Sequence, residues 1–294
     1  RQRQMCIRDS CLIMTIVMTL LVRNEEDVIR ENIEYHLAQG VDYFIATDNR
    51  STDATAAILK EYERKGVLRY LFEGDDDYSQ SQWVTRMARM AFTSYDAEWV
   101  INNDADEFWW PFSGTLKSVL LDLPPEINMV TAQRVNFVAV ERPESSFIHS
   151  MVFREKNSLN PIGRPLLRKV AHRGYAGVTV AQGNHSVAGI DHPKSVDRIV
   201  EIFHFPTRSY QQIENKIVNG GAAYERNTKL PSRVGFAWRQ LYREYQANGD
   251  LKHYYEKHFY DAERLEAQLN SGMLVRDDRL SLFFSRTQLD DSAR

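Results

Sequence analysis

The sequence predicts an α/β fold in which a mostly parallel central sheet is flanked by helices, with further helices toward the C-terminus. Two observations carry this prediction. Short apolar runs alternate with amphipathic helical stretches over residues 13–102, which is the order that builds right-handed βαβ units. From residue 210 onward, apolar residues again recur at helical spacing.

The elements of the first half follow from apolar spacing and from the residues at their ends. The run 13–22 is apolar and too short to cross a bilayer, which takes about 20 residues, so it predicts a buried strand. The strands expected in this half are 13–22, 42–47, 67–72 and 99–102. Three helices are expected between these strands. The first spans 25–39, the second begins with a cap at Thr52 or Asp53 and ends at Gly66, and the third begins after a cap at Ser79.

The pattern becomes less regular after residue 110, where Pro111 and the pair Pro124–Pro125 interrupt it. The elements expected there are a strand at 129–140, a mixed stretch to about 207, and helices at 210–226, 236–246 and 254–269. We therefore divide the chain into an α/β half at 14–110, a second half of the same domain at 111–227, and a helical extension at 228–294.

Residues 1–13 do not fit this pattern. The first ten are polar and irregular and lack an initiator Met, so we expect 1–13 to be a non-native or disordered leader and Met14 to be the natural start.

Composition narrows the classes of protein. A formal net charge of -3 gives no basic excess, so we expect no nucleic-acid partner. The two cysteines, Cys6 and Cys11, allow neither a disulfide framework nor a cysteine zinc site, which favours a cytoplasmic protein. No apolar run is long enough for a transmembrane segment, so any membrane contact would be peripheral, at the inner face.

Polar residues follow three of the expected strands. Because the carboxyl ends of parallel strands meet at one edge of a sheet, these side chains should lie together. They are Arg23, Asn24 and Glu25, then Asp48, Arg50 and Asp53, then Asp104 and Asp106. Carboxylates suit Mn²⁺ or Mg²⁺, and arginines pair with phosphate oxygens, so the edge predicts a site for a nucleotide diphosphate and its metal. Two alternatives stay open: residues 48–53 as only a turn and helix cap, and Asp75–Asp77 as a solvated acidic loop rather than a second metal site.

Three segments in this order, 15–25, 47–55 and 99–108, resemble the family-2-type glycosyltransferases of the GT-A fold. That fold is the Rossmann-like fold of nucleotide-diphospho-sugar transferases. The closer resemblance is to a bacterial branch related to family 92, which residues 203–209 and Lys216 also resemble.

The resemblance implies a UDP- or GDP-linked sugar as donor, a divalent metal (Mn²⁺ or Mg²⁺), and transfer with inversion to an acceptor hydroxyl. The expected acceptor, a glycan or a lipid-linked molecule, follows from a locally basic second half, which fits a solvated surface equally well. Its basic residues are Arg142, Arg154, Arg164, Arg168, Lys169 and Arg173.

The resemblance also implies that Asp48 holds the base and that Asp104 and Asp106 hold ribose and metal, with Asp106 the firmer ligand. His204 would be the third metal ligand, and Lys216 would contact the diphosphate. Without the resemblance, His204 is equally well a core histidine between Phe203 and Phe205.

The general base is not assigned by the resemblance, because the acidic pair that often supplies it in family 2 has no clear equivalent. The candidates are Glu141, His172, His185, Asp191 and Glu201, of which we retain His185, Asp191 and Glu201. Unperturbed imidazole titrates near neutrality, which suits a base, although either histidine could be structural.

Other functions fit less well. A dehydrogenase would carry a Gly-rich turn after the first strand, where Val22-Arg23-Asn24-Glu25 stands. A haloacid-type phosphatase would carry its nucleophile after strand one, and a sugar nucleotidyltransferase would carry a Gly-rich phosphate loop near the start. An inactive nucleotide- or glycan-binding module of the same fold remains the alternative.

Overall fold

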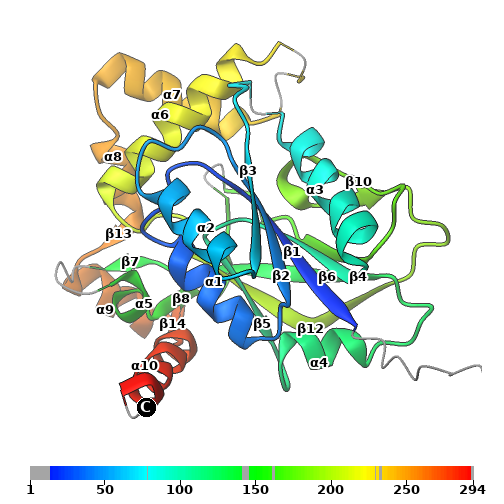
Figure 1. The fold of residues 1–294 in the computed structure, drawn as a ribbon. Helices are drawn as coiled ribbons and strands as arrows, with labels where there is room; N and C mark the ends of the chain where they lie inside the picture. Colours follow the sequence, from blue (N-terminus) through cyan, green and yellow to red (C-terminus); the bar gives the residue numbers. More distant parts are fainter. Residues whose placement is uncertain are drawn as a thin grey trace, which may run out of the picture.

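A curled eight-stranded sheet with helices on both faces forms the body of the protein in this computed structural model (Figure 1). The structure describes residues 14–77, 79–140, 146–160, 163–228, 230–231 and 234–292. The expectations for the leader 1–13 and for Glu141 therefore lie outside the described residues.

The first half has the predicted alternation of parallel strands and helices. Its strands are β1 (Thr15–Val22), β2 (Tyr43–Asp48), β3 (Leu68–Phe72) and β4 (Ala97–Asn103), in the sheet order β3-β2-β1-β4. The connecting helices are α1 (Ile29–Ala38), α2 (Thr55–Arg64) and α3 (Gln80–Tyr95). Alternate residues of β1 face opposite layers: Ile16 and Met18 pack in the core with α1, and Val17 packs beneath α3.

The second half extends the same sheet in the order β9-β6-β12-β5. The four strands are β5 (Glu107–Pro111), β6 (Met129–Asn136), β9 (Lys169–Arg173) and β12 (Ser195–His204). Strand β9 runs antiparallel between β4 and β6, and β5 runs antiparallel to β12, whereas β6 and β12 are parallel. The predicted mostly parallel sheet is therefore confirmed, with two antiparallel strands.

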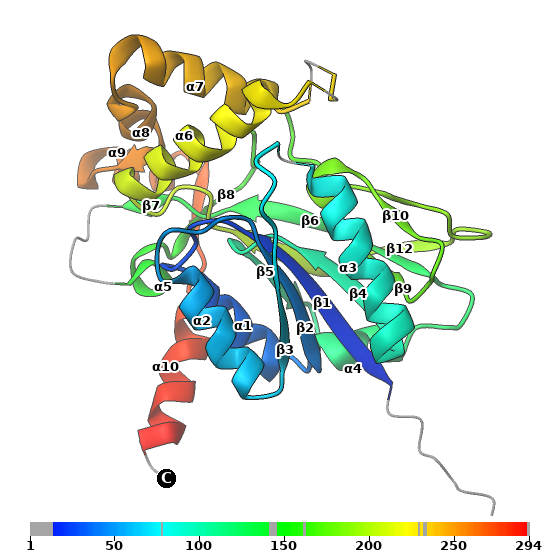
Figure 2. The ribbon, with the colours of Figure 1, turned by 45° about the horizontal axis from the view of Figure 1, so that its top comes forward.

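Short elements and the C-terminal helices complete the fold. The short ones are α4 (Leu116–Leu121), β7 (Ala139–Val140), α5 (Phe147–Ser150), β8 (Phe153–Glu155), β10 (Thr179–Val180), a 3-10 turn η1 (Gln182–Asn184) and β11 (Val187–Ala188). They are followed by α6 (Tyr210–Arg226), α7 (Phe236–Asn248), α8 (Lys252–His258), β13 (Phe259–Tyr260), α9 (Ala262–Asn270), β14 (Leu274–Arg276) and α10 (Arg279–Ser292). Figure 2 shows α6, α7 and α8 grouped at one end of the molecule, away from α10. Among the described residues, no helix combines the length and the apolar character needed to cross a membrane.

Two predicted elements are wrong in the same way. The expected strand 129–140 ends at Asn136, and the expected helix 254–269 is broken at Phe259. The cause is one long-range pairing, because the short strand β13 pairs in parallel with β7. Local apolar spacing carries no information about such a pairing.

Helix starts also differ from the prediction. Residues 25–28 form a turn in which the Glu25 carbonyl accepts the N–H groups of Val28 and Ile29, so α1 begins four residues later than expected. Helix α2 begins after Ala54, and the Asp53 carboxylate accepts the Thr55 N–H. Ser79 precedes α3 as expected, but its side chain makes no capping hydrogen bond.

Candidate functional site

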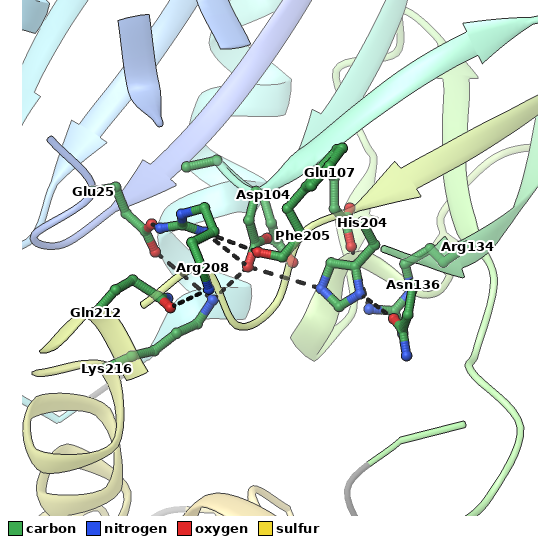
Figure 3. A network of polar contacts seen from close by, with 12 residues as sticks. Glu25, Asp104, Glu107, Arg134, Asn136, His204, Phe205, Arg208, Gln212 and Lys216 are labelled. Carbon is green, nitrogen blue, oxygen red and sulfur yellow. Dashed lines mark hydrogen bonds and ion pairs between the residues drawn. The ribbon is translucent and has the colours of Figure 1, made fainter. Parts of the chain in front are cut away.

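One edge of the sheet collects charged side chains from strands of both directions (Figure 3). Strands β4, β6 and β12 end at this edge, whereas the antiparallel strands β9 and β5 begin there. Asp104 and Asp106 follow β4, Glu107 and Lys169 open β5 and β9, and His204 closes β12. In register, His204 lies opposite both Glu107 and Asn136, so the three share one face of the sheet.

Asp106 is the most strongly contacted acid of this edge and is 2% exposed. Its Oδ2 lies 2.5 Å from Lys216 Nζ, 3.8 Å from His204 Nε2 and 3.9 Å from Arg208 Nη1. Burial alone would raise the pKa of Asp106, but the positive charges of Lys216 and Arg208 and the hydrogen bond from Lys216 hold it well below its usual range. The carboxylate is therefore ionised at neutral pH.

His204 is held as a neutral imidazole. Its Nδ1 lies 2.7 Å from Asn136 Oδ1, and the Asn136 amide is itself oriented by donating to Glu155 and to the Leu159 carbonyl. Nδ1–H is therefore the donor, and the lone pair of Nε2 faces Asp106. Burial lowers the pKa of His204 to about 3, so the ring carries no charge at neutral pH. A neutral imidazole with an oriented second nitrogen is the form that binds metals.

Glu107 completes a group that fits a divalent metal. One ligand atom from each of Asp106, Glu107 and His204 lies within 4.8 Å of the others. Glu107 Oε1 pairs with Arg134 at 3.2 Å and Lys169 at 3.3 Å, while the buried Oε2 has no hydrogen-bond partner among the described residues. Burial raises the pKa of Glu107 to about 7. Two carboxylates, one imidazole and an unsatisfied oxygen suit Mn²⁺ or Mg²⁺.

Asp104 lies outside this three-residue group, although the sequence predicts it as a metal ligand. Its Oδ2 is paired with the fully buried ammonium of Lys169, and its Oδ1 accepts a hydrogen bond from Asn184 Nδ2 at 3.0 Å. The carboxylate is about one-third exposed. It is thus fixed in orientation while keeping contact with solvent.

Sequence reasoning did not find several charged or polar residues of this edge. Four of them are Glu107, Lys169, Asn184 and Arg208. Arg208 and Glu107 lie within segments that carry the family resemblance, so adjacency to the motifs was a usable signal. Lys169 and Asn184 arrive through the antiparallel strand β9 and the turn η1, and nothing local in the sequence marks them.

A profile of the family described as glycosyltransferase family 92 matches residues 14–229. The chain belongs to glycosyltransferase family 92. The predicted membership of the GT-A class, in the branch related to family 92, is confirmed.

Two of the solved structures that are similar to this family 92 chain were determined with nucleotides bound. Staphylococcus aureus TarS (residues 1–349, with UDP) is 14% identical, with 80% of this chain and 74% of that chain covered and a TM-score of 0.43. Glucosyl-3-phosphoglycerate synthase from Mycobacterium tuberculosis, solved with Mn²⁺, UDP-glucose and glycerol 3-phosphate, is 22% identical, with a TM-score of 0.31. That match covers 41% of this chain and 44% of the synthase. A search of curated proteins finds no match.

In this family 92 chain, hydrogen bonds join the loop after β1 to the loop after β2. Asp48 accepts hydrogen bonds from the Ser51 N–H and the Tyr70 hydroxyl, each at 2.9 Å. Asn24 Oδ1 accepts the Thr52 N–H, and Asp53 accepts the Glu26 N–H. The structure therefore brings Asn24, Asp48 and Asp53 together and gives all three a role in loop geometry, as the turn-and-cap alternative expects.

Within the acidic loop, Asp75 is exposed as expected, whereas Asp76 is paired with arginines. Asp76 pairs with Arg23 at 2.6 Å, Arg226 at 2.6 Å and Arg50 at 3.4 Å. Two of these arginines are the predicted phosphate contacts, so an internal carboxylate occupies the groups that would meet an anionic ligand. Among the described residues, Asp75–Asp77 form no metal-binding group.

A second pair of predicted donor residues meets beside Asp106. Glu25 accepts from Arg208 Nη2 at 2.7 Å, and its other oxygen lies 3.8 Å from Lys216 Nζ. Burial raises the pKa of Glu25, although Lys216 and Arg208 oppose the change. A cavity of about 60 Å³ adjoins this pair, and its lining includes Arg23, Glu25, Asn49, Lys216 and Trp238.

The three retained base candidates lie in different places. His185 follows Asn184 at the site, and its Nδ1 donates to the Arg168 carbonyl at 2.9 Å. Asp191 is exposed beside Asn128, at the start of β6 and β12, which is the edge opposite His204. Glu201 stands three residues before His204 on β12 and so faces the other side of the sheet, paired with Arg154 and Arg279. Only His185 is brought to the site.

His172, the other histidine considered as a base, is fully buried within β9. Its Nδ1 donates to the Arg173 carbonyl, and burial lowers its pKa to about 4. This position is that of a structural histidine.

Proposed function

We propose that this family 92 chain transfers a sugar from a nucleoside diphosphate sugar to an acceptor hydroxyl, with inversion and with a divalent metal. The observation that carries the proposal is the buried group of Asp106, Glu107 and His204 at the carboxyl edge of the sheet. Asp106 and His204 belong to the predicted metal set, and the matched family is one of glycosyltransferases.

Asp106, His204 and Glu107 would hold the metal, Mn²⁺ or Mg²⁺. When bound, the metal would neutralise the diphosphate and stabilise it as a leaving group. Asp104, outside the three-residue group and partly exposed, would accept hydrogen bonds from ribose hydroxyls. Asp48 would accept from the base while it keeps the loop after β2 in place.

The basic side chains that would pair with the phosphate oxygens of the donor are paired with carboxylates in this structure. Arg23 and Arg50 pair with Asp76, and Lys216 pairs with Asp106. The adjoining cavity of about 60 Å³ is far below the roughly 300–1,000 Å³ of small-molecule sites. A diphosphate entering this cavity would therefore require side chains that line it, such as Lys216 and Trp238, to move.

His185 is the proposed base. Its Nδ1–H is committed to the Arg168 carbonyl, so Nε2 keeps its lone pair for the proton of an acceptor hydroxyl. Burial lowers the pKa of His185 to about 4, with help from Lys169 and Arg134, so the ring is neutral at pH 7. The proposed acceptor is a glycan or a lipid-linked alcohol, the second of which would bring the protein to the inner face of a membrane.

Thermal unfolding with UDP and GDP, each with Mn²⁺ or with chelator, tests the proposal. One of the nucleotides should raise the melting temperature only when metal is present, because a ligand of the folded state stabilises it by mass action. No metal-dependent shift with either nucleotide would contradict the proposal. Shifts without donor hydrolysis or transfer, over a panel of UDP and GDP sugars, would favour the inactive binding module instead.

A further inference from the structure

Lys216 occupies the atom that a metal ion would use. Its ammonium lies 2.5 Å from Asp106 Oδ2, and the same oxygen is the one that faces His204 Nε2 at 3.8 Å. A divalent metal bound between Asp106 and His204 would need this oxygen. Two cations on one buried oxygen repel each other strongly, since little water screens them. The ammonium and the metal therefore exclude each other at Asp106.

The charged side chains of the site already pair with one another. Five carboxylates, those of Glu25, Asp27, Asp104, Asp106 and Glu107, face four cationic side chains, those of Arg134, Lys169, Arg208 and Lys216. A metal ion arriving alone would place two further positive charges beside these four cations. A diphosphate arriving with it would bring the compensating negative charge.

Lys216 is placed to move between these two states. Its ammonium is within 3.8 Å of Glu25 and lies beside the small cavity that Arg23 and Asn49 also line. Lysine carries its charge on a flexible four-carbon stem, so it can change partner while α6 stays in place. Figure 3 shows Lys216 reaching from its helix toward Glu25 and Arg208, on the side of the site opposite Asn136 and Arg134.

From these contacts we propose that Lys216 is an exchangeable counter-ion of Asp106, which it leaves when a divalent metal binds in order to pair with the diphosphate of the donor. The inference rests on the proposed function and adds that metal and donor diphosphate bind cooperatively. Metal binds weakly while Lys216 holds Asp106, and donor diphosphate strengthens metal binding because it offers Lys216 another partner. By linkage, metal strengthens nucleotide binding by the same factor.

The test is a titration of Mn²⁺ followed by electron paramagnetic resonance, without nucleotide and with UDP or GDP. Three variants are compared with the parent: Lys216→Met, Lys216→Gln and Lys216→Arg. Lys216→Gln is included in case Lys216→Met does not fold, because glutamine can still donate a hydrogen bond to Asp106. Lys252→Gln, at a lysine that is exposed on α8, is the control for loss of one positive charge.

Without nucleotide, Lys216→Gln and Lys216→Met should bind Mn²⁺ at least tenfold more tightly than the parent, because no ammonium competes with the metal for Asp106 Oδ2. The added affinity that nucleotide gives should be smaller in both variants than in the parent. Lys216→Arg and Lys252→Gln should bind Mn²⁺ alone no more tightly than the parent.

Two contrary outcomes have different meanings. Mn²⁺ binding by the parent with nucleotide, together with unchanged or weaker Mn²⁺ binding by Lys216→Gln alone, would overturn the exchange and leave the proposed function standing. Mn²⁺ binding by none of these proteins, with or without nucleotide, would overturn the proposed function together with the inference.

Discussion

Asp106 Oδ2 meets three groups of different chemistry: an ammonium, a guanidinium and a neutral imidazole. Each arrives from beyond residue 200, whereas Asp106 follows β4. Phe203 and Phe205, on either side of His204, are buried in the core and fix where the imidazole points. The two interpretations of His204, as a core histidine and as a metal ligand, are therefore compatible, because its buried neighbours fix the orientation of the imidazole ring.

Asp106→Asn should weaken metal binding strongly at neutral pH. The amide keeps the shape of the side chain but removes the charge, so Mn²⁺ affinity should fall by more than 100-fold. Calorimetric titration in the presence of UDP or GDP measures the change. Asp122→Asn, at an exposed carboxylate after α4, is the matched control and should bind Mn²⁺ like the parent.

His36 gives a pH dependence that is independent of the site. This fully buried histidine accepts the Trp109 N–H at Nε2, and burial lowers its pKa to about 3. The unfolded chain, with a histidine pKa near 6.5, binds more protons than the folded protein between these values. The free energy of unfolding should therefore fall as pH drops from 6.5 toward 3, with His36 contributing about 2 kcal/mol between pH 7.5 and pH 5.

Urea unfolding of the parent and of His36→Gln at these two pH values checks that contribution. Glutamine can still accept from the Trp109 N–H but does not titrate. The variant should therefore lose less stability on acidification than the parent. An equal loss in both proteins would show that His36 contributes nothing to the pH dependence.

At the scale of elements, α6 is the link between the site and the C-terminal helices. The bounds predicted for this helix, 210–226, are correct, because a serine cap and a regular apolar face define it locally. The cap is Ser209, whose hydroxyl accepts the Gln212 N–H. Lys216 stands on this helix, and Gly220 and Gly221 follow one turn later, where α7 crosses closely. The position of Lys216 therefore depends on how closely the two helices pack.

Gly221→Ala should destabilise the protein although alanine is the better helix former. A Cβ at Gly221 would lie 2.5 Å from the Tyr242 Cβ and 2.9 Å from the Trp238 carbonyl oxygen, and the backbone atom cannot move aside cheaply. The steric cost, about 1–3 kcal/mol for overpacking, should exceed the gain in helix propensity of about 1 kcal/mol. Thermal unfolding measures the balance, with Gly74→Ala, where the nearest atom is 3.6 Å away, as the control.

At the scale of the whole molecule, the sheet explains what the sequence could and could not predict. Alternating strands and helices implied that Asp48 and Asp104 lie at one edge of the sheet, and β2 and β4 do run parallel on either side of β1. The insertion of β9 between β4 and β6 depends on hydrogen bonds between residues some 70 positions apart, such as the pairing of Val100 with His172. No local pattern reports that pairing, so the sequence predicted Lys169 as one of the basic residues of the second half and not as a partner of Asp104.

Lys169→Met should test how much this insertion stabilises the site. Lys169 is fully buried and pairs with both Asp104 and Glu107, so its removal leaves two carboxylates without their main partner. Breaking a buried ion pair from one side costs about 3–5 kcal/mol. Urea unfolding should show a loss of this size, whereas Lys194→Met, at an exposed lysine before β12, should stay within about 0.5 kcal/mol of the parent.

Hydrolysis of UDP- and GDP-linked sugars, followed as release of the nucleoside diphosphate with Mn²⁺ and with chelator, tests the central claim most directly. It needs no knowledge of the acceptor, because water can replace the acceptor hydroxyl. We expect the parent to release nucleotide from at least one donor only when metal is present, and Asp106→Asn to do so at least 100-fold more slowly. Release that chelator does not reduce, or equal release by Asp106→Asn, would contradict a metal-dependent transferase centred on Asp106.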